Sequence, residues 1–162
     1  MGLIDFVKNA GSKIFGKEDE KQSSSASDRA VIDARRAAAL RGGIGHLGLE
    51  VEDLEIEVKG DLATVRGKVA TQAAREKVVL VVGNTAGIAR VDDRLEVEKQ
   101  EPEAQLHTVA KGETLSKIAK QYYGNAMKYP VIFEANKPML TDPDKIYPGQ
   151  VLRIPALEEA SN

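Results

Sequence analysis

Residues 82–88 (VGNTAGI) form the stretch of this sequence most suited to binding a ligand through its backbone. Two glycines and an asparagine within five residues predict that the chain leaves a helix through positive φ angles. Such a turn points several main-chain carbonyl groups away from helix and sheet partners, and these carbonyls need other partners. A hard cation is one such partner. A helix end without a ligand is the other interpretation, and the loop alone does not decide between the two.

The other reactive residue types do not form a recognisable catalytic or transition-metal site. His46 and His107 are isolated, and neither belongs to a metal-ligand spacing, so both are expected to be structural or solvated. The acidic residues over 50–57 fit the solvent side of a strand better than a general acid/base pair. No cysteine, nucleophile elbow, P-loop or dinucleotide fingerprint is found in the sequence. We therefore expect a protein that is not an enzyme.

Composition narrows the class of partner. The 162 residues are 42% hydrophobic and 30% charged, which is enough apolar material for a core. A net charge of −2 with dispersed lysines and arginines predicts no nucleic-acid partner. Charged residues interrupt the apolar start of the chain, so we predict no signal peptide, and no run is long enough for a membrane span. We expect a monomeric, cytoplasmic protein.

The first sixteen residues carry apolar side chains at helical spacing. Leu3, Val7, Ala10 and Ile14 recur every three or four positions, with Phe6 beside them, which predicts an amphipathic helix over 1–16. A free helix this short is marginal in water, so we expect it to dock on the following domain. A membrane-surface helix is the alternative, and the low positive charge argues against it.

The segment 17–27 (KEDEKQSSSAS) reads as a flexible linker, and 28–98 as the first domain. Alternation of apolar and charged residues over 54–58 and 62–69 predicts a hairpin around Gly60. Thr71 is the predicted N-cap of the helix that ends in the 82–88 turn. In order, we predict a helix over 28–41 that the following glycines break, two strands, a second helix and a strand over 91–97.

A polar linker over 99–105 precedes a second domain over 106–155 and a tail over 156–162. Thr114 is the predicted N-cap of its first helix and Gly124 the residue that ends it. Pro130 fits the first turn of a second helix, which Asn136 and Pro138 stop. Short strands over 106–109 and 151–154 enclose these helices.

Two known domain types resemble these parts. The segments 107–115 (HTVAKGETL), 132–136 (IFEAN) and 146–155 (IYPGQVLRIP) closely resemble a LysM domain. The segments 65–69 (VRGKV) and 87–95 (GIARVDDRL) resemble a BON domain. The resemblances imply an α+β protein in which a BON domain (α-β-β-α-β) precedes a LysM domain (β-α-α-β) with two helices on one face of a two-stranded sheet.

The combination of these domains with the start MGLIDFVKNA and the segment 133–140 (FEANKPML) resembles the bacterial cytoplasmic potassium-binding BON–LysM proteins. In that family main-chain carbonyls hold K+. The resemblance implies the carbonyl groups of five residues as ion ligands: Val7, Ala10, Gly83, Thr85 and Ile88. It also implies that K+ tightens the packing of the LysM domain on the BON domain. Because crowded carbonyls repel one another, we expect the N-terminal segment to be loose without the ion.

The LysM resemblance supports an alternative partner, a polymer of N-acetylglucosamine such as peptidoglycan. LysM domains bind such glycans in a shallow groove between the first loop and the loop before the last strand. In this sequence the groove would consist of Gly112, Glu113, Thr114, Leu115, Ile146, Tyr147, Pro148 and Gly149. The expected location away from peptidoglycan makes this the second of the two hypotheses.

Overall fold

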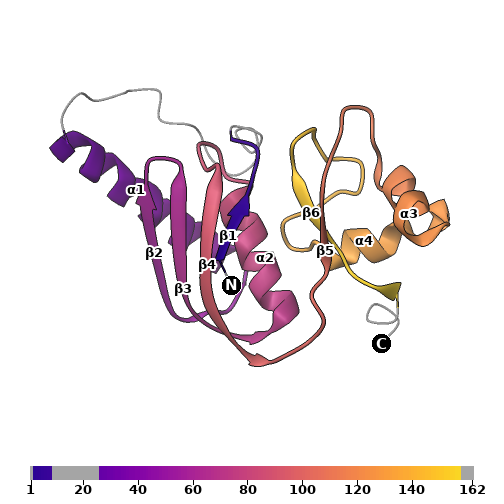
Figure 1. The fold of residues 1–162 in the computed structure, drawn as a ribbon, viewed down its shortest axis with the longest axis horizontal. Helices are drawn as coiled ribbons and strands as arrows, with labels where there is room; N and C mark the ends of the chain where they lie inside the picture. Colours follow the sequence, from indigo (N-terminus) through magenta and orange to yellow (C-terminus); the bar gives the residue numbers. More distant parts are fainter. Residues whose placement is uncertain (1, 9–25, 158–162) are drawn as a thin grey trace.

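The computed structural model describes residues 2–8 and 26–157 of the chain (Figure 1). The N-terminal part consists of β1 (Gly2–Asp5), α1 (Ala26–His46), β2 (Glu52–Lys59), β3 (Leu62–Thr71), α2 (Gln72–Gly83) and β4 (Arg90–Lys99). The C-terminal part consists of β5 (Gln105–Thr108), α3 (Leu115–Tyr123), the 3-10 turn η2 (Ala126–Lys128), α4 (Tyr129–Ala135) and β6 (Val151–Ile154). From α1 onward, the structure confirms the predicted order of helices and strands.

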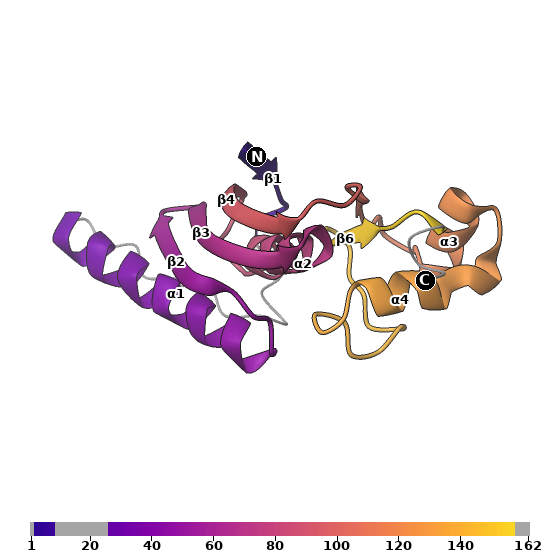
Figure 2. The same cartoon turned by 90° about the horizontal axis from the view of Figure 1, so that it is seen from below.

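The N-terminal part is a four-stranded sheet in the order β1-β4-β3-β2 with both helices on one face (Figure 2). Strands β2 and β3 form the predicted hairpin, and β3 and β4 pair in parallel across α2. In β2 and β4 the inward side chains alternate with charged ones, as a sheet with one solvated face requires. Val65 and Val91 are fully buried beneath α2.

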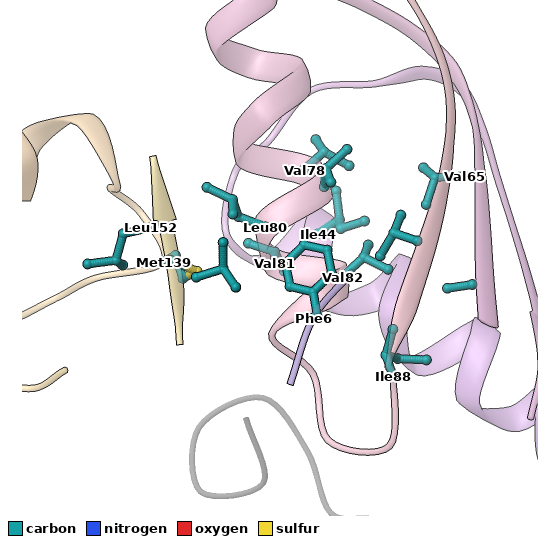
Figure 3. Packing of buried hydrophobic residues seen from close by; sticks show 14 of the residues in the cluster. Phe6, Ile44, Val65, Val78, Leu80, Val81, Val82, Ile88, Met139 and Leu152 are labelled. Atoms are coloured by element: carbon teal, nitrogen blue, oxygen red, sulfur yellow. The ribbon is translucent and has the colours of Figure 1, made fainter. Parts of the chain in front are cut away.

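Helix α2 is buried on nearly all sides. Its residues Val78 and Val82 are fully buried in the cluster that includes the sheet residues, while Leu80 and Val81 lie toward Met139 of the C-terminal part (Figure 3). Both the valines and the polar residues Gln72, Arg75 and Glu76 of this helix are buried, so it must be covered on nearly all sides. Here the sheet and the C-terminal part cover it together, and the buried apolar residues of both parts form one continuous cluster.

The predicted N-terminal helix is wrong over the residues that the structure describes. Gly2–Asp5 form the edge strand β1, antiparallel to β4, with Ile4 opposite Val91. The side chains alternate: Leu3 is 59% exposed, whereas Phe6 is only 8% exposed. Strand pairing covers an otherwise open edge of β4, and burial of Phe6 contributes about 2 kcal/mol, so an edge strand is favoured over an isolated short helix. Residues 9–16 of the predicted helix lie outside the described residues.

The predicted break after residue 41 is also wrong. Helix α1 continues through Gly42, Gly43 and Gly45 to His46, and the chain turns at Gly48, whose φ is +78°. Leu40 and Ile44 lie in the core, at 6% and 1% exposure. Tertiary burial of this face offsets the roughly 1 kcal/mol that each helical glycine costs.

In the C-terminal part, β5 and β6 form an antiparallel pair against which α3 and α4 pack. Thr114 caps α3 through a bond from the Lys117 N–H, and Gly124 ends it in the left-handed conformation, as predicted. Pro130 lies in the first turn of α4 and Asn136 is its C-cap, also as predicted. Within the described residues, the helices are too short or too polar to cross a membrane.

Candidate functional site

The α2–β4 loop is a tight turn held by backbone bonds. Helix α2 ends at Gly83, and Asn84 keeps an ordinary φ of −82°, so the predicted left-handed helix exit does not occur there. Positive φ is found at Gly87, at +84°. The N–H of Asn84 donates to Leu80 at 2.9 Å, and the N–H of Thr85 donates to Val82 at 3.2 Å. The last helical turn is therefore closed before the chain reverses.

The three predicted carbonyl ligands of this loop differ in their hydrogen bonding. The Thr85 carbonyl accepts a bond from the Ile88 N–H at 3.2 Å. The carbonyls of Gly83 and Ile88 accept no hydrogen bond from the residues that the structure describes. A carbonyl oxygen has two lone pairs, so all three retain capacity for a further partner. Gly83 and Ile88 are buried, which makes unfilled capacity costly there.

The N-terminal segment reaches this loop through Phe6. Its N–H donates to the Ala89 carbonyl at 2.8 Å. Its ring lies against Gly83 so closely that a Cβ added to Gly83 would collide with it. Val7, the next residue and a predicted ligand, follows directly and is exposed. Ala10, the other predicted ligand of this segment, lies outside the described residues.

Arg36 of α1 also supports the loop, and no local sequence pattern identifies it. Its Nη2 donates to the Gly87 carbonyl at 3.2 Å and its Nη1 to the Gly60 carbonyl at 2.6 Å. The same guanidinium pairs with Asp33 at 3.2 Å. These bonds tie the hairpin turn and the α2–β4 loop to one helix.

Asn84 connects the loop to the C-terminal part of the molecule. Its Nδ2 donates to the Val151 carbonyl at 2.9 Å, and its Oδ1 accepts from the Val151 N–H at 2.8 Å. Nδ2 also lies 3.3 Å from the Met139 sulfur. The side chain, 2% exposed, thus pairs with the outer edge of β6 as a neighbouring strand would. The sequence placed Asn84 in the loop but could not reveal a partner 67 residues away.

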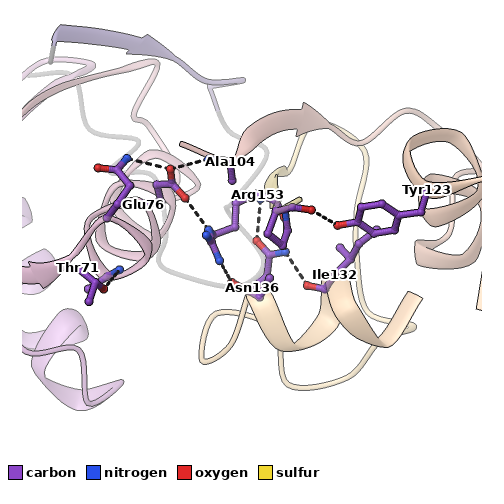
Figure 4. Close-up of polar contacts among 11 residues, drawn as sticks. Thr71, Glu76, Ala104, Tyr123, Ile132, Asn136 and Arg153 are labelled. Carbon is purple, nitrogen blue, oxygen red and sulfur yellow. Dashed lines mark hydrogen bonds and ion pairs between the residues drawn. The ribbon is translucent and has the colours of Figure 1, made fainter. Parts of the chain in front are cut away.

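A buried ion pair forms a second link between the two parts (Figure 4). The Nε of Arg153, on β6, donates to Oε1 of Glu76, on α2, at 2.8 Å. Oε2 of Glu76 accepts bonds from the Gln72 side chain and from the Ala104 N–H. Partial burial, with the Arg153 charge as a smaller cause, lowers the pKa of neighbouring Lys77. Because a buried ion pair loses its hydration, it fixes the alignment of α2 and β6 more than it adds stability.

The two loops of the predicted glycan groove lie side by side. The Gly149 N–H donates to the Val109 carbonyl at 2.8 Å, and the Val109 N–H donates to Gln150 at the same distance. Glu113 is bound within the fold, to His107 at 2.8 Å and to the Ala110 N–H at 2.7 Å, whereas the buried Tyr147 hydroxyl has no hydrogen-bond partner among the described residues. Burial raises the pKa of Tyr147 to about 12. Glycan binding at this groove stays a prediction.

The ligands that the α2–β4 loop can offer to an ion are backbone carbonyls rather than side chains. No group of three or more His, Cys, Asp or Glu side chains gathers into a metal site within residues 2–8 and 26–157. The loop instead offers neutral backbone carbonyls. Hydrogen bonds from Phe6 to Ala89 and from Arg36 to Gly87 hold the chain around them. Such a site can hold a weakly hydrated monovalent cation better than a divalent one, for which carboxylates are the usual ligands.

Comparison with known proteins assigns both domains and the whole chain. A BON domain model matches residues 28–99 and a LysM domain model matches residues 107–155. A protein of Deinococcus radiodurans, described as uncharacterized, is 50% identical over 50 residues, which is 31% of this chain and 19% of that protein. The "Potassium binding protein Kbp" of Escherichia coli O6:H1 (strain CFT073) is 42% identical over 160 residues, covering 96% of this chain and 99% of that protein. The chain therefore belongs to the Kbp family, in which a BON domain precedes a LysM domain.

Proposed function

We propose that this protein binds K+ through backbone carbonyl groups and that the bound ion tightens the packing of the LysM domain on the BON domain. The ligands are the carbonyls of Gly83, Thr85 and Ile88 in the α2–β4 loop together with those of Val7 and Ala10. The observation that carries the proposal is that the buried Gly83 and Ile88 carbonyls accept no hydrogen bond from the described residues. The printed name of the Escherichia coli relative supports K+ binding. The proposal makes the protein a cytoplasmic ion-binding protein rather than an enzyme.

K+ suits this site because of its low charge density. Neutral carbonyl dipoles can replace its hydration shell, whereas a divalent ion would favour carboxylate oxygens. The C-terminal end of α2 adds the negative end of a helix dipole. Phe6 brings the N-terminal segment to the loop, so ligands from both segments can converge on one ion.

The link to the LysM domain follows from the position of Asn84. It stands between the proposed ligands Gly83 and Thr85, and its side chain binds both backbone groups of Val151. An ion that fixes the two flanking carbonyls also restricts the backbone of Asn84. The ordered side chain then loses less conformational entropy when it pairs with β6. Ion binding and domain packing thereby favour each other, as linkage requires.

Calorimetric titration of KCl into protein equilibrated in choline chloride tests the proposal. Wild-type protein should give saturable K+ binding, and a variant that lacks residues 1–10 should lose it because the N-terminal ligands are gone. Thr85→Ala should bind K+ nearly as wild type, since the proposed ligand is its backbone carbonyl. Its hydroxyl donates to the Val81 carbonyl at 2.8 Å, so its loss should cost about 1 kcal/mol of stability at most.

Gly83→Val changes the same loop as Thr85→Ala, but it is expected to abolish K+ binding. A Cβ at Gly83 would displace the Phe6 ring, so this variant should lose K+ binding even where circular dichroism shows a folded chain. If the variant without residues 1–10 bound K+ as wild type does, the N-terminal segment would not be part of the site. Loss of binding in Thr85→Ala alone would identify the hydroxyl, not the carbonyl, as the ligand.

A further inference from the structure

A cavity lies along α2, between the N-terminal strand and the linker to the LysM domain. We call it the seam cavity. Its volume is about 240 Å³. Its apolar wall residues are Leu3, Ile4, Val79, Leu80, Ala104 and Leu106. At about 30 Å³ for each water-sized group, it has room for roughly eight non-hydrogen atoms.

The charged groups of the seam cavity are already paired. Arg75 Nε donates to Asp93 Oδ2 at 2.7 Å, and Asp93 Oδ1 accepts from the Leu95 N–H at 3.1 Å. Both oxygens of Glu76 are occupied, one by Arg153 and the other by Gln72 and Ala104. Neither carboxylate is left to attract a cation.

Two polar groups in the wall retain hydrogen-bonding capacity. The terminal Nη groups of Arg75 make no hydrogen bond to any residue that the structure describes, although the residue is only 3% exposed. Gln72 turns its amide nitrogen to Glu76, because a carboxylate can only accept. Its own oxygen, on a residue 5% exposed, therefore has no donor within the described part of the chain. Within the described residues, the fully buried side-chain atoms without a hydrogen-bond partner belong to Tyr147 and Gln150, so both groups here still reach water in the cavity. A ligand with matching polar groups can replace that water.

The charge balance favours an uncharged ligand. The Arg75–Asp93 pair is neutral as a unit, and Glu103 at the wall is exposed and negative, so an anion would be repelled as well as desolvated. We propose that the seam cavity binds a small uncharged molecule that has an apolar chain and one amide group. The amide oxygen accepts from Arg75, the amide N–H donates to the Gln72 oxygen, and the chain lies against Val79 and Leu106.

The walls of the seam cavity come from separate parts of the molecule. β1, α2, the linker and β5 each contribute residues, so the cavity is complete only when the N-terminal strand and the LysM domain are in place. A ligand here would stabilise that arrangement. The proposal is independent of K+, and its test gives a result whether or not K+ binds.

The test uses nuclear magnetic resonance of the ¹⁵N-labelled full chain, titrated with pentanamide in NaCl buffer and again in KCl buffer. Pentanamide should cause saturable shifts at the amides of Val79, Leu80, Ala104 and Leu106, with a dissociation constant on the order of 1 mM. Sodium pentanoate, with the same chain length and a negative charge, should bind about tenfold more weakly.

Variants that place a larger side chain in the seam cavity distinguish binding inside the cavity from contact at the surface. Ala104→Leu should abolish the shifts, and Leu106→Trp provides a second obstruction at a residue that is 40% exposed and tolerant of size. Ala38→Leu, on the exposed face of α1, is the matched control and should bind as wild type. The proposal is overturned if pentanamide gives no saturable shifts, if both filling variants still bind it, or if pentanoate binds more tightly.

Discussion

Two asparagines make the same contact with β6 from different domains. Asn136, the C-cap of α4 within the LysM domain, donates to the Arg153 carbonyl at 2.9 Å and accepts from the Arg153 N–H at 2.8 Å. Asn84, the C-cap of α2 in the BON domain, makes the equivalent pair of bonds to Val151, two residues earlier. Together they complete the outer edge of a four-residue strand.

The two contacts differ in what happens when they are lost. The Arg153 backbone groups bind Asn136 of the same domain, so this contact persists when the domains separate. The Val151 groups lie at a contact between domains, and water can reach them if the domains separate. The first contact is therefore part of the LysM fold, whereas the second links the two domains, and the K+ proposal makes the α2–β4 loop its control.

Asn136→Ala should have the largest effect. It removes three side-chain bonds, one to the Ile132 carbonyl at 2.8 Å and two to the N–H and carbonyl of Arg153. At about 1–3 kcal/mol for each unsatisfied group, we expect a loss of about 3 kcal/mol in the free energy of unfolding of the LysM domain, measured by urea denaturation. If Asn136→Ala lowered the free energy of unfolding by less than Asn84→Ala does, the proposed difference between the two contacts would be wrong. Asn125→Ala, which removes only a cap bond to Met127, is the control.

Asn84→Ala should cost less, about 1–2 kcal/mol, because the Val151 groups can be hydrated once the domains part. The expected signature is a wider distribution of domain arrangements in small-angle X-ray scattering, with both domains still folded by nuclear magnetic resonance. A compact, wild-type scattering profile in both KCl and NaCl would show that Asn84 does not control domain packing.

The smallest effect concerns pH and stays within the LysM domain. The Ala110 N–H, and then the His107 side chain, hold the pKa of Glu113 below its usual value. A carboxylate with a lowered pKa in the folded state contributes stability above pH 4.5, and this is lost as pH falls through the folded pKa. Glu113→Gln should therefore flatten the decline in melting temperature as the pH falls below 4.5. If the melting temperature of Glu113→Gln fell with pH as in wild type, this role of Glu113 would be contradicted. If the variant bound K+ differently from wild type, the LysM domain and the K+ site would not be independent.

The sequence predicted the features that depend on neighbouring residues. The caps Thr71 and Thr114, the left-handed Gly124 and the place of Pro130 each follow from a few adjacent side chains. The succession of helices and strands along the BON domain follows from alternation and turn residues. The loop that joins α2 to β4 was identified for the same reason.

The features that could not be predicted from the sequence depend on residues far away along the chain. Leu3 and Val7 suit a helix by spacing, but the open edge of β4 favours a strand, and nothing near residue 3 encodes that edge. The glycines after residue 41 weaken a helix locally, while burial of Ile44 maintains it. The roles of Asn84 and Glu76 required Val151 and Arg153 to be brought to α2 by the fold.

The thermal melt of the wild-type chain in KCl, NaCl and choline chloride at equal ionic strength tests the central proposal most directly. A ligand that binds only the folded state adds about 2.7 kcal/mol at 100 times its dissociation constant. The proposed carbonyl site predicts a melting temperature that is higher in KCl than in either other salt. Equal melting temperatures in all three salts would contradict it.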